Sequence, residues 1–288
     1  MYKKVVCLLI ITLVQTNLQA QKKSNLVFLN HIYFVLDSNT YAHIFDSAFL
    51  QQIGNTKAAS VTTTDESWSG KYFYGRDSYF ELFSPTGFEG AAIGDVGFGF
   101  MTFKQGDIWE VKKNWKDNSK DSVITDTSTY VSDGKRQEWY YSLNLSAVDS
   151  LLSVSAWVME NTPGILKAAG FSDEEIKKPI SWQEYVEKKY KTNFTKAFNR
   201  ITSVELITNK DEYDYLKKSF SGFGLLKKNH RFYNDFVTIK CTIENVASTK
   251  LKTVVIELNE GFPERTIIMS THLTMHVKDK SASLIFNY

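Results

Sequence analysis

The stretch Leu29–Asp37 (LNHIYFVLD) carries the clearest structural signal in this sequence. Its side chains alternate between two faces, with Ile32 and Phe34 on one side and His31 and Tyr33 on the other. Both faces are largely apolar, so we expect a strand that is buried on both sides. The stretch therefore predicts an interior strand of a sheet.

The residues that follow this strand predict a helix and then a β-hairpin. Apolar residues recur at helical spacing between Ser38 and Gly54. Strands are expected over 71–75 and 78–84, because Gly75-Arg76-Asp77 between them is a turn sequence. A further strand is expected over 96–103, and a helix over 107–115.

The rest of the chain shows the same alternation of strands and helices. The polar residues 114–128 are expected to form a loop and an exposed hairpin. The further expected elements are strands 138–145 and 151–160, helices 163–169 and 181–190 (with Ser181 and Glu184 as a capping box), strand 201–208, helix 211–220 capped by Asn209, and several strands to the end. A unit of strand, helix and strands thus begins near Leu29, Val96 and Ile201.

The first twenty residues have the pattern of an export signal. Residues 1–4 (MYKK) carry two positive charges, residues 5–14 form an apolar run, and a small-residue cleavage site ends at Ala20. The apolar run is about half of the roughly 20 residues that a spanning helix needs. We expect cleavage after Ala20, with an uncleaved N-terminal anchor as the alternative. The mature protein is then expected to be exported to the periplasm or the extracellular space.

Charge and cysteine content limit the functions that remain. Of the 2 cysteines, Cys7 lies in the signal, which leaves Cys241 without a disulfide partner. The net charge of +2 falls to zero when Lys3 and Lys4 are removed, which argues against nucleic-acid binding. No later segment is long and apolar enough to cross a bilayer. An aromatic content of 14% with only 4 prolines fits a β-rich protein.

Residues 31–37, the helix after them and Tyr79–Phe83 together resemble one βαβββ module of the vicinal oxygen chelate superfamily, which includes glyoxalase I and ring-cleaving dioxygenases. Glu81 lies 50 residues after His31, an interval similar to that of the family. The tryptophan-containing strands near Trp139 and Trp157 make the order most similar to that of glyoxalase-like proteins. The resemblance implies an α+β fold, in which repeated βαβββ modules form curved sheets around a funnel-shaped pocket.

The resemblance also implies a division of the chain. Residues 1–20 are the signal peptide, and residues 21–162 form a glyoxalase-like domain of two modules. Residues 163–199 form a helical connection, and residues 200–288 form an additional βαβββ-like C-terminal module.

The candidate site follows from the same resemblance. In many members the first strand carries a histidine and the last strand of the module a glutamate, and both bind a divalent metal; here these are His31 and Glu81. The second module departs from the pattern, because residues 97–100 (GFGF) stand where a second histidine is common. Its late strand offers Glu160.

A metal ion needs three or four converging ligands, so two donors leave an alternative open. In that alternative, His31 and Glu81 hydrogen-bond each other or a ligand inside an apolar pocket. Glu81 and Glu160 are the candidate catalytic groups, because a buried carboxylate beside a partner can act as a general base.

Aromatic walls with few polar groups are typical of small-molecule sites. The candidate ligand-binding residues are Tyr72, Tyr74, Arg76, Tyr79, Trp139 and Trp157. Packing within the core or against a sheet is the alternative for each of them. Three functions therefore remain: a metal-assisted enzyme, a small-molecule-binding protein, and a structural or partner-binding domain whose pocket is filled by side chains.

Overall fold

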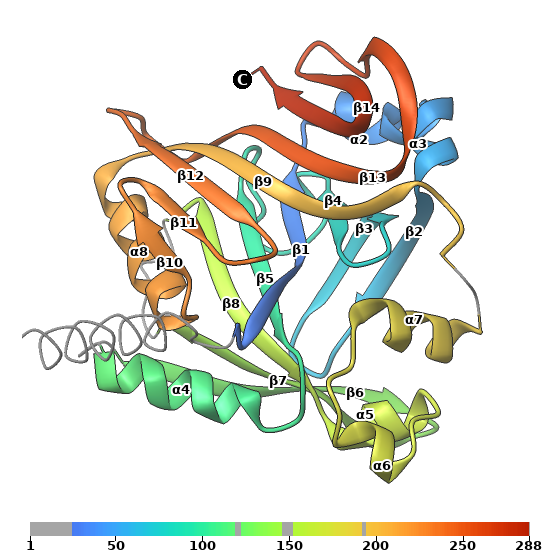
Figure 1. The fold of residues 1–288 in the computed structure, drawn as a ribbon, viewed down its shortest axis with the longest axis vertical. Helices are drawn as coiled ribbons and strands as arrows, with labels where there is room; N and C mark the ends of the chain where they lie inside the picture. Colours follow the sequence, from blue (N-terminus) through green and yellow to red (C-terminus); the bar gives the residue numbers. More distant parts are fainter. Residues whose placement is uncertain (1–24, 119–121, 146–151, 192–193, 288) are drawn as a thin grey trace, which may run out of the picture.

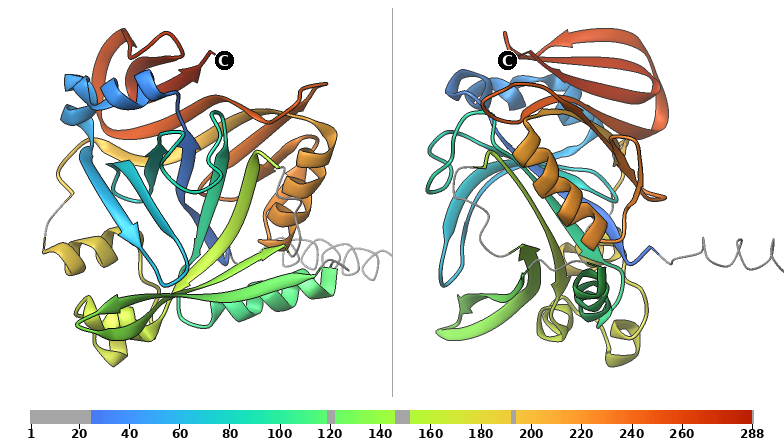
Figure 2. Two further views of the ribbon diagram at one scale, coloured as in Figure 1. Left: turned by 180° about the vertical axis from the view of Figure 1, so that it is seen from behind. Right: turned by 90° about the vertical axis from the view of Figure 1, so that its left-hand side faces the viewer.

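The computed structural model describes residues 25–118, 122–145, 152–191 and 194–287. Within them the chain forms two mixed β-sheets with helices around them, which confirms an α+β fold dominated by strands. The larger sheet has eight strands and curls into a half-barrel, while the smaller has six (Figures 1 and 2). The expected export signal lies outside the described residues.

The first half of the larger sheet begins with the strand that the sequence predicts. Its elements are β1 (Val27–Val35), α2 (Ser38–His43), a 3-10 turn (Ile44–Asp46), α3 (Ala48–Ile53), β2 (Asn55–Thr62), β3 (Ser67–Tyr74) and β4 (Tyr79–Phe83). β3 and β4 form the predicted hairpin, and β4 then pairs in parallel with β1. The helix cap is Asp37, whose carboxylate accepts a hydrogen bond from the Thr40 amide.

The second half of this sheet follows in the same chain order. Its elements are β5 (Val96–Thr102), α4 (Asp107–Asn118), β6 (Val123–Ser132), β7 (Lys135–Leu145) and β8 (Val154–Asn161). β5 pairs in parallel with β8 and antiparallel with β1, which joins the two halves into the order β2-β3-β4-β1-β5-β8-β7-β6. Within the polar stretch 114–128, residues 114–118 lie in α4 and not in a loop, while residues 123–128 belong to β6, which forms a hairpin with β7 at the edge of the sheet.

Three short helices connect the sheets: α5 (Pro163–Ala168), α6 (Asp173–Ile176) and α7 (Trp182–Tyr190). The predicted capping box at the start of α7 is confirmed, because Ser181 and Glu184 exchange side-chain and backbone hydrogen bonds. These helices bury a small apolar cluster of their own, which includes Ile165, Leu166 and Tyr185.

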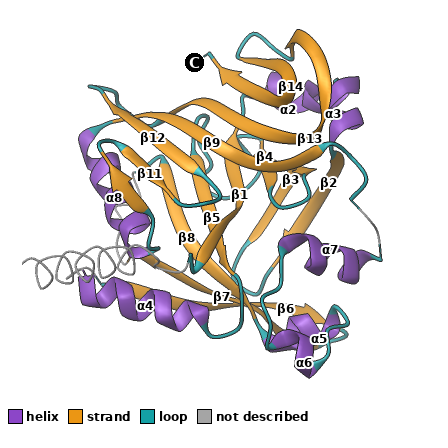
Figure 3. Cartoon of the chain, in the orientation of Figure 1, coloured by secondary structure: helices purple, strands orange, loops and turns teal. Residues whose placement is uncertain are grey.

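The six-stranded sheet is built from the C-terminal part of the chain. Its elements are β9 (Phe198–Thr208), α8 (Lys210–Gly222), β10 (Leu226–Lys228), β11 (Arg231–Tyr233), β12 (Thr238–Ile243), β13 (Lys250–Ile268) and β14 (Leu273–Phe286). The strand order is β10-β11-β12-β9-β13-β14, with β9 parallel to β12. Asn209 caps α8 as predicted. Figure 3 shows α8 beside α4, where Trp115 packs against Phe223.

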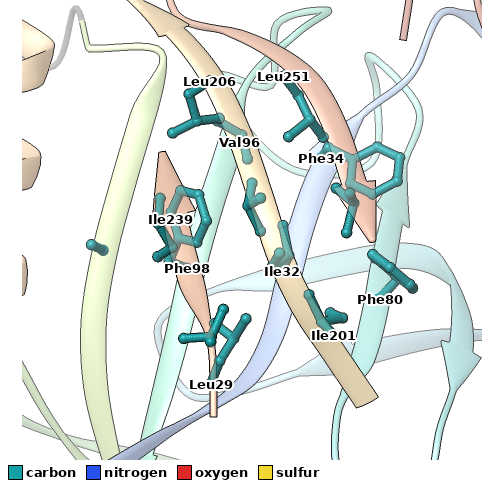
Figure 4. Packing of buried hydrophobic residues seen from close by; sticks show 14 of the residues in the cluster. Leu29, Ile32, Phe34, Phe80, Val96, Phe98, Ile201, Leu206, Ile239 and Leu251 are labelled. Carbon is teal, nitrogen blue, oxygen red and sulfur yellow. The ribbon is translucent and has the colours of Figure 1, made fainter. Parts of the chain in front are cut away.

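One continuous core joins the two sheets. The face of the larger sheet that carries Ile32, Phe34 and Phe98 packs against residues of the smaller sheet such as Ile201 and Leu206 (Figure 4). Side chains at alternate positions must therefore point away from the smaller sheet. Among the described residues, no helix is long and apolar enough to cross a membrane.

Candidate functional site

The candidate site lies on the face of the eight-stranded sheet that is turned away from the six-stranded sheet. In the parallel pair β1 and β4, His31 lies opposite Tyr79 and Tyr33 lies opposite Glu81. Ile32 between them is in the core, so these four side chains share the other face. We call this surface the aromatic face; it comprises Tyr33, Tyr72, Tyr74, Tyr79, Tyr140 and Trp157 around His31 and Glu81.

His31 is a neutral, tightly packed imidazole. Its side chain is buried, stacked on Tyr79 with ring centroids 4.8 Å apart and in edge contact with Trp157 at 5.3 Å. Nδ1 lies 3.0 Å from the Asn30 side-chain oxygen, which can only accept, so Nδ1 is the donor and Nε2 keeps its lone pair. Burial lowers the pKa of His31 from 6.5 to about 3.

Two glycines of β5 make room for the rings of β1. Gly99 lies opposite His31, and a Cβ there would stand 2.3 Å from the His31 ring. Gly97 lies opposite Tyr33, and a Cβ there would stand 2.1 Å from the Tyr33 ring. The resemblance implies a second metal ligand in this part of β5. The structure has glycines there, and the side chains of His31 and Tyr33 fill the space beside them.

Glu81 is a half-buried carboxyl group surrounded by phenol rings. Its Oε1 lies 3.3 Å from the Tyr79 hydroxyl, which donates to it. Burial raises the pKa of Glu81 from 4.5 to about 7, and the Tyr79 hydroxyl offsets part of that shift. No basic residue among the described residues contributes to the shift. The carboxyl therefore exchanges between its neutral and charged forms near neutral pH.

The Glu81 carboxyl group affects the pKa of every tyrosine of the aromatic face. Burial is the first cause that raises the pKa of each phenol, and the negative charge of Glu81 raises each of them further; they are Tyr33, Tyr72, Tyr74, Tyr79 and Tyr140. The phenols are therefore neutral and can donate hydrogen bonds. Two of them are held in place: the Tyr33 hydroxyl lies 3.0 Å from Ser155 Oγ, and the Trp68 indole donates to Tyr72.

The structure brings together four of the six predicted ligand-binding residues, namely Tyr72, Tyr74, Tyr79 and Trp157. The other two lie elsewhere. Arg76 is in the turn between β3 and β4, where its backbone amide donates to Phe198 and its guanidinium lies 3.5 Å from Asp77. Trp139 packs against the cluster of α5, α6 and α7, and its ring lies 5.2 Å from that of Tyr140 at the border of the aromatic face.

Glu160 lies on the opposite face of the sheet from Glu81, because it is three residues after Trp157 on β8. Its carboxylate accepts hydrogen bonds from the Thr102 hydroxyl and from the backbone amides of Gly106 and Ile108, at 2.8 to 2.9 Å. Those amides stand at the start of α4, where unpaired donors and the helix dipole favour a carboxylate. The Glu160 carboxylate therefore caps the beginning of α4.

The donors at the aromatic face do not fit a divalent metal. His31 and Glu81 supply two, and the facing positions on β5 and β8 are Gly97, Gly99 and Trp157. The described residues contain no group of three or more His, Cys, Asp or Glu side chains that could hold an ion. A closed or catalytic site needs at least three protein ligands.

Three members of the site escaped sequence reasoning: Tyr33, Tyr140 and Trp182. Tyr33 could have been found, because it lies two residues after His31 on the same strand face. Trp182 could not, since it comes from α7 and stacks on Tyr79 with centroids 4.9 Å apart. Tyr79 is thus held between His31 and Trp182.

Two cavities lie away from the aromatic face. One, of about 100 Å³, is lined by residues of α4, α8 and the start of β1, including Glu110 and Asn234. The other, of about 20 Å³, lies beside Glu160 and Tyr185. Both are far below the roughly 300 to 1,000 Å³ of ordinary ligand pockets, and the smaller has room for about one water.

Comparison with known proteins identifies a sequence family and similar solved folds for this chain. The sequence model of a family of unknown function, DUF5829, matches residues 29–286. No curated protein matches the chain. A solved structure of a hypothetical protein from Staphylococcus aureus is similar over 84% of this chain and 95% of that one, with a TM-score of 0.52 and 13% identity. A xylose isomerase-like TIM barrel/4-hydroxyphenylpyruvate dioxygenase fusion protein aligns with 78% of this chain and 35% of that one, with a TM-score of 0.42 and 10% identity.

Proposed function

This chain belongs to the DUF5829 family, and we propose that it is an exported, glyoxalase-like protein that binds a small molecule against the aromatic face, with Glu81 as the polar anchor. One observation carries the proposal. Glu81 places a half-buried carboxyl group among aromatic rings, where no basic residue of the described chain neutralises it. Aromatic walls with a single converging polar group are typical of ligand sites.

The strand pairing supports the glyoxalase-like part of the proposal. Each half of the larger sheet runs strand, helix, three strands, and in each the first strand pairs in parallel with the last. The two halves meet through the antiparallel pair of β1 and β5. A third unit of this kind, β9 to β12 with α8, supports an additional C-terminal module. The basic and apolar residues before Gln21 support export.

We propose binding that does not depend on a metal. The two donors His31 and Glu81 fall short of a coordination sphere, and the neutral His31 ring is packed between Tyr79 and Trp157. What these residues can do is hydrogen-bond: Glu81 accepts or donates according to its protonation, and the phenols donate. Glu81 is also placed to accept a proton from a bound compound, which keeps a metal-free enzyme within the proposal.

A second candidate function rests on a different observation. Tyr79 fills the space over His31 because it is stacked between His31 and Trp182. A funnel filled in this way would suit a structural or partner-binding domain. Glu81, Tyr74 and Trp157 nevertheless remain half-exposed, which favours the ligand site.

The test is a thermal-unfolding screen of the mature chain against a metabolite library, with Glu81→Gln as the site variant. We expect at least one compound to raise the melting temperature of the wild type, and we expect Glu81→Gln to lose that increase. Glu244→Gln, at an exposed glutamate that follows the end of β12, is the matched control and should behave as the wild type. A library in which every stabilising compound acts equally on Glu81→Gln would rule out this site and favour the second candidate.

A further inference from the structure

The charges around the aromatic face identify the kind of compound that would bind there. We propose that the ligand is an organic cation, an amine or a quaternary ammonium group, held between the Glu81 carboxylate and the tyrosine rings. This inference rests on the proposed small-molecule function, because it names the ligand class of the same site.

The first argument is the sign of the charge. The ionised side chains whose fields reach the site are acidic: Glu81 acts on all five tyrosines, Asp95 acts on Tyr33, and Glu66 and Asp126 act on Tyr140. An anionic ligand would meet this field without a counter-charge. A cation would gain from it and would give Glu81 the partner that it lacks.

The nearby basic residues do not fill that role. Lys57 shares the face of Tyr72 by strand register, but its side chain is exposed and its ammonium lies 6.0 Å from the Tyr190 ring. Lys71 is one residue out of step and points to the other face, where its ammonium donates to the backbone oxygens of Tyr41 and Ala42. The Glu81 carboxylate therefore has no cation among these lysines.

The second argument is the arrangement of the rings. Tyr72 and Tyr74 lie nearly parallel, with centroids 5.9 Å apart, and Tyr74 lies 5.3 Å from Tyr79. Trp157 of β8 lies 6.0 Å from Tyr33 of β1, across the intervening strand β5. Electron-rich ring faces gathered in this way attract a cation, and quaternary ammonium ligands are bound in such aromatic surroundings. The phenols are neutral, so the partly exposed Tyr33 and Tyr74 offer uncharged rings and not phenolate charges, whereas both faces of the Tyr79 ring are covered by His31 and Trp182.

The third argument concerns desolvation. A carboxylate held among rings loses much of its hydration without receiving an ion-pair partner, which is unfavourable. An ammonium ligand reverses that cost for the charged form, whereas a neutral alcohol of the same shape does not. Selectivity for the cation over its neutral counterpart is therefore the property that distinguishes this site from a general apolar surface.

The experiment compares matched probes that differ only in charge. Phenethylamine, phenethyl alcohol and hydrocinnamate supply a cation, a neutral compound and an anion around one aromatic ring. Choline and its neutral tert-butyl analogue supply the quaternary case. Binding is measured by isothermal titration calorimetry and by tryptophan fluorescence of the mature protein, whose Trp157 and Trp182 lie at the site.

We expect at least one cation to bind roughly tenfold or more tightly than its neutral counterpart, and the anion not to bind. Glu81→Gln should weaken cation binding about tenfold or more and weaken binding of the neutral probe much less. Tyr74→Leu should weaken it, while Tyr74→Phe, which keeps the ring, should retain most of it. Glu244→Gln is again the control, and the Tyr74 pair keeps the test valid if Glu81→Gln does not fold.

Three outcomes would overturn the inference, and they differ in whether the proposed small-molecule function is refuted as well. Equal binding of the amine and the alcohol, unchanged in Glu81→Gln and Tyr74→Leu, would refute the cation while the small-molecule function stands. Tighter binding of hydrocinnamate would do the same. Absence of binding by every probe, together with no stabilising compound in the library, would remove both proposals.

Discussion

Glu81 and Glu160 sit on the last strands of the two halves of one sheet, yet they are held in opposite ways. Glu160 lies on the opposite face of the sheet and accepts three hydrogen bonds, two of them from amides at the start of α4. Glu81 lies on the aromatic face with a single long bond from Tyr79. Burial raises the pKa of both, and three hydrogen bonds oppose that shift for Glu160, whereas the single bond from Tyr79 opposes it for Glu81. A carboxylate satisfied by backbone amides supports the fold, whereas one left among rings is available to a ligand.

The largest effect should come from removing the satisfied carboxylate. Glu160→Ala leaves two backbone amides and the Thr102 hydroxyl without their acceptor inside the protein, which should lower the free energy of unfolding by about 3 kcal/mol. Urea denaturation measures it. Glu110→Ala changes an exposed glutamate of α4 and is the control. It should change stability by less than about 0.5 kcal/mol. Equal effects at the two positions would erase the contrast between the glutamates.

The second effect should depend on pH. The folded-state pKa of Glu81 is raised to about 7, so the stability that its proton contributes is complete below about 4.5 and is lost as the pH rises through 7. Glu81→Gln should therefore match the wild type near pH 4.5 and be more stable near pH 8, by an amount on the order of 2 kcal/mol. Thermal unfolding across this range, normalised to Glu244→Gln, is the measurement. A difference that did not grow with pH would contradict the assignment.

The contribution of His31 to stability changes with pH in the opposite direction, and it does so at lower pH. Its folded-state pKa is lowered to about 3, so its stabilising contribution is complete above about 6.5 and is lost as the pH falls towards 3. The comparison of Glu81→Gln with the wild type cancels this term, because both proteins keep His31.

The third effect tests how the first-strand rings are seated. Gly99→Ala would drive a methyl group into the His31 ring and should cost on the order of 1 to 2 kcal/mol in unfolding free energy. In the His31→Ala background the same change should cost little, because the obstructing ring is gone. Gly164→Ala, where the nearest atom is 3.8 Å away, is the control and should be close to neutral. An unchanged cost in both backgrounds would place the clash elsewhere.

The smallest effect should come from removing the Tyr79 hydroxyl, which donates a hydrogen bond to Glu81. Tyr79→Phe removes a 3.3 Å hydrogen bond that favours the charged carboxylate, so the pKa of Glu81 should rise slightly above about 7. Carbon-13 NMR of the Glu81 carboxyl follows the titration. Tyr74→Phe, which removes a phenol with no such bond, provides the comparison, and a fall in pKa in Tyr79→Phe would contradict the role assigned to the hydroxyl.

Local patterns predicted much of this molecule. Alternation over 29–37 placed His31 opposite to Ile32, the turn at Gly75–Asp77 predicted the hairpin, and the caps at Ser181 and Asn209 are confirmed. These features depend on neighbouring residues alone. Alternation over 79–83 also put Tyr79 and Glu81 on one strand face, while the choice of Glu81 itself came from the family resemblance.

What the sequence did not predict depends on contacts between distant segments. The face on which Glu160 lies relative to His31 is set by the register of β1, β5 and β8, and no single strand carries that information. Trp139 was predicted at the site but packs against the helical cluster, because the position of α5 to α7 also depends on distant contacts. Trp182 reaches Tyr79 only because α7 folds back onto the sheet.

The glycine at position 99 also restricts how this protein could evolve. A histidine there would restore the second ligand that the resemblance implies, but its side chain would have to occupy space that the His31 ring already fills. The first step towards a metal site therefore passes through a protein with a damaged sheet, and at least two coordinated substitutions are needed. The same ring that fills the site in this protein therefore stands in the way of a second imidazole at position 99 for as long as His31 keeps its place.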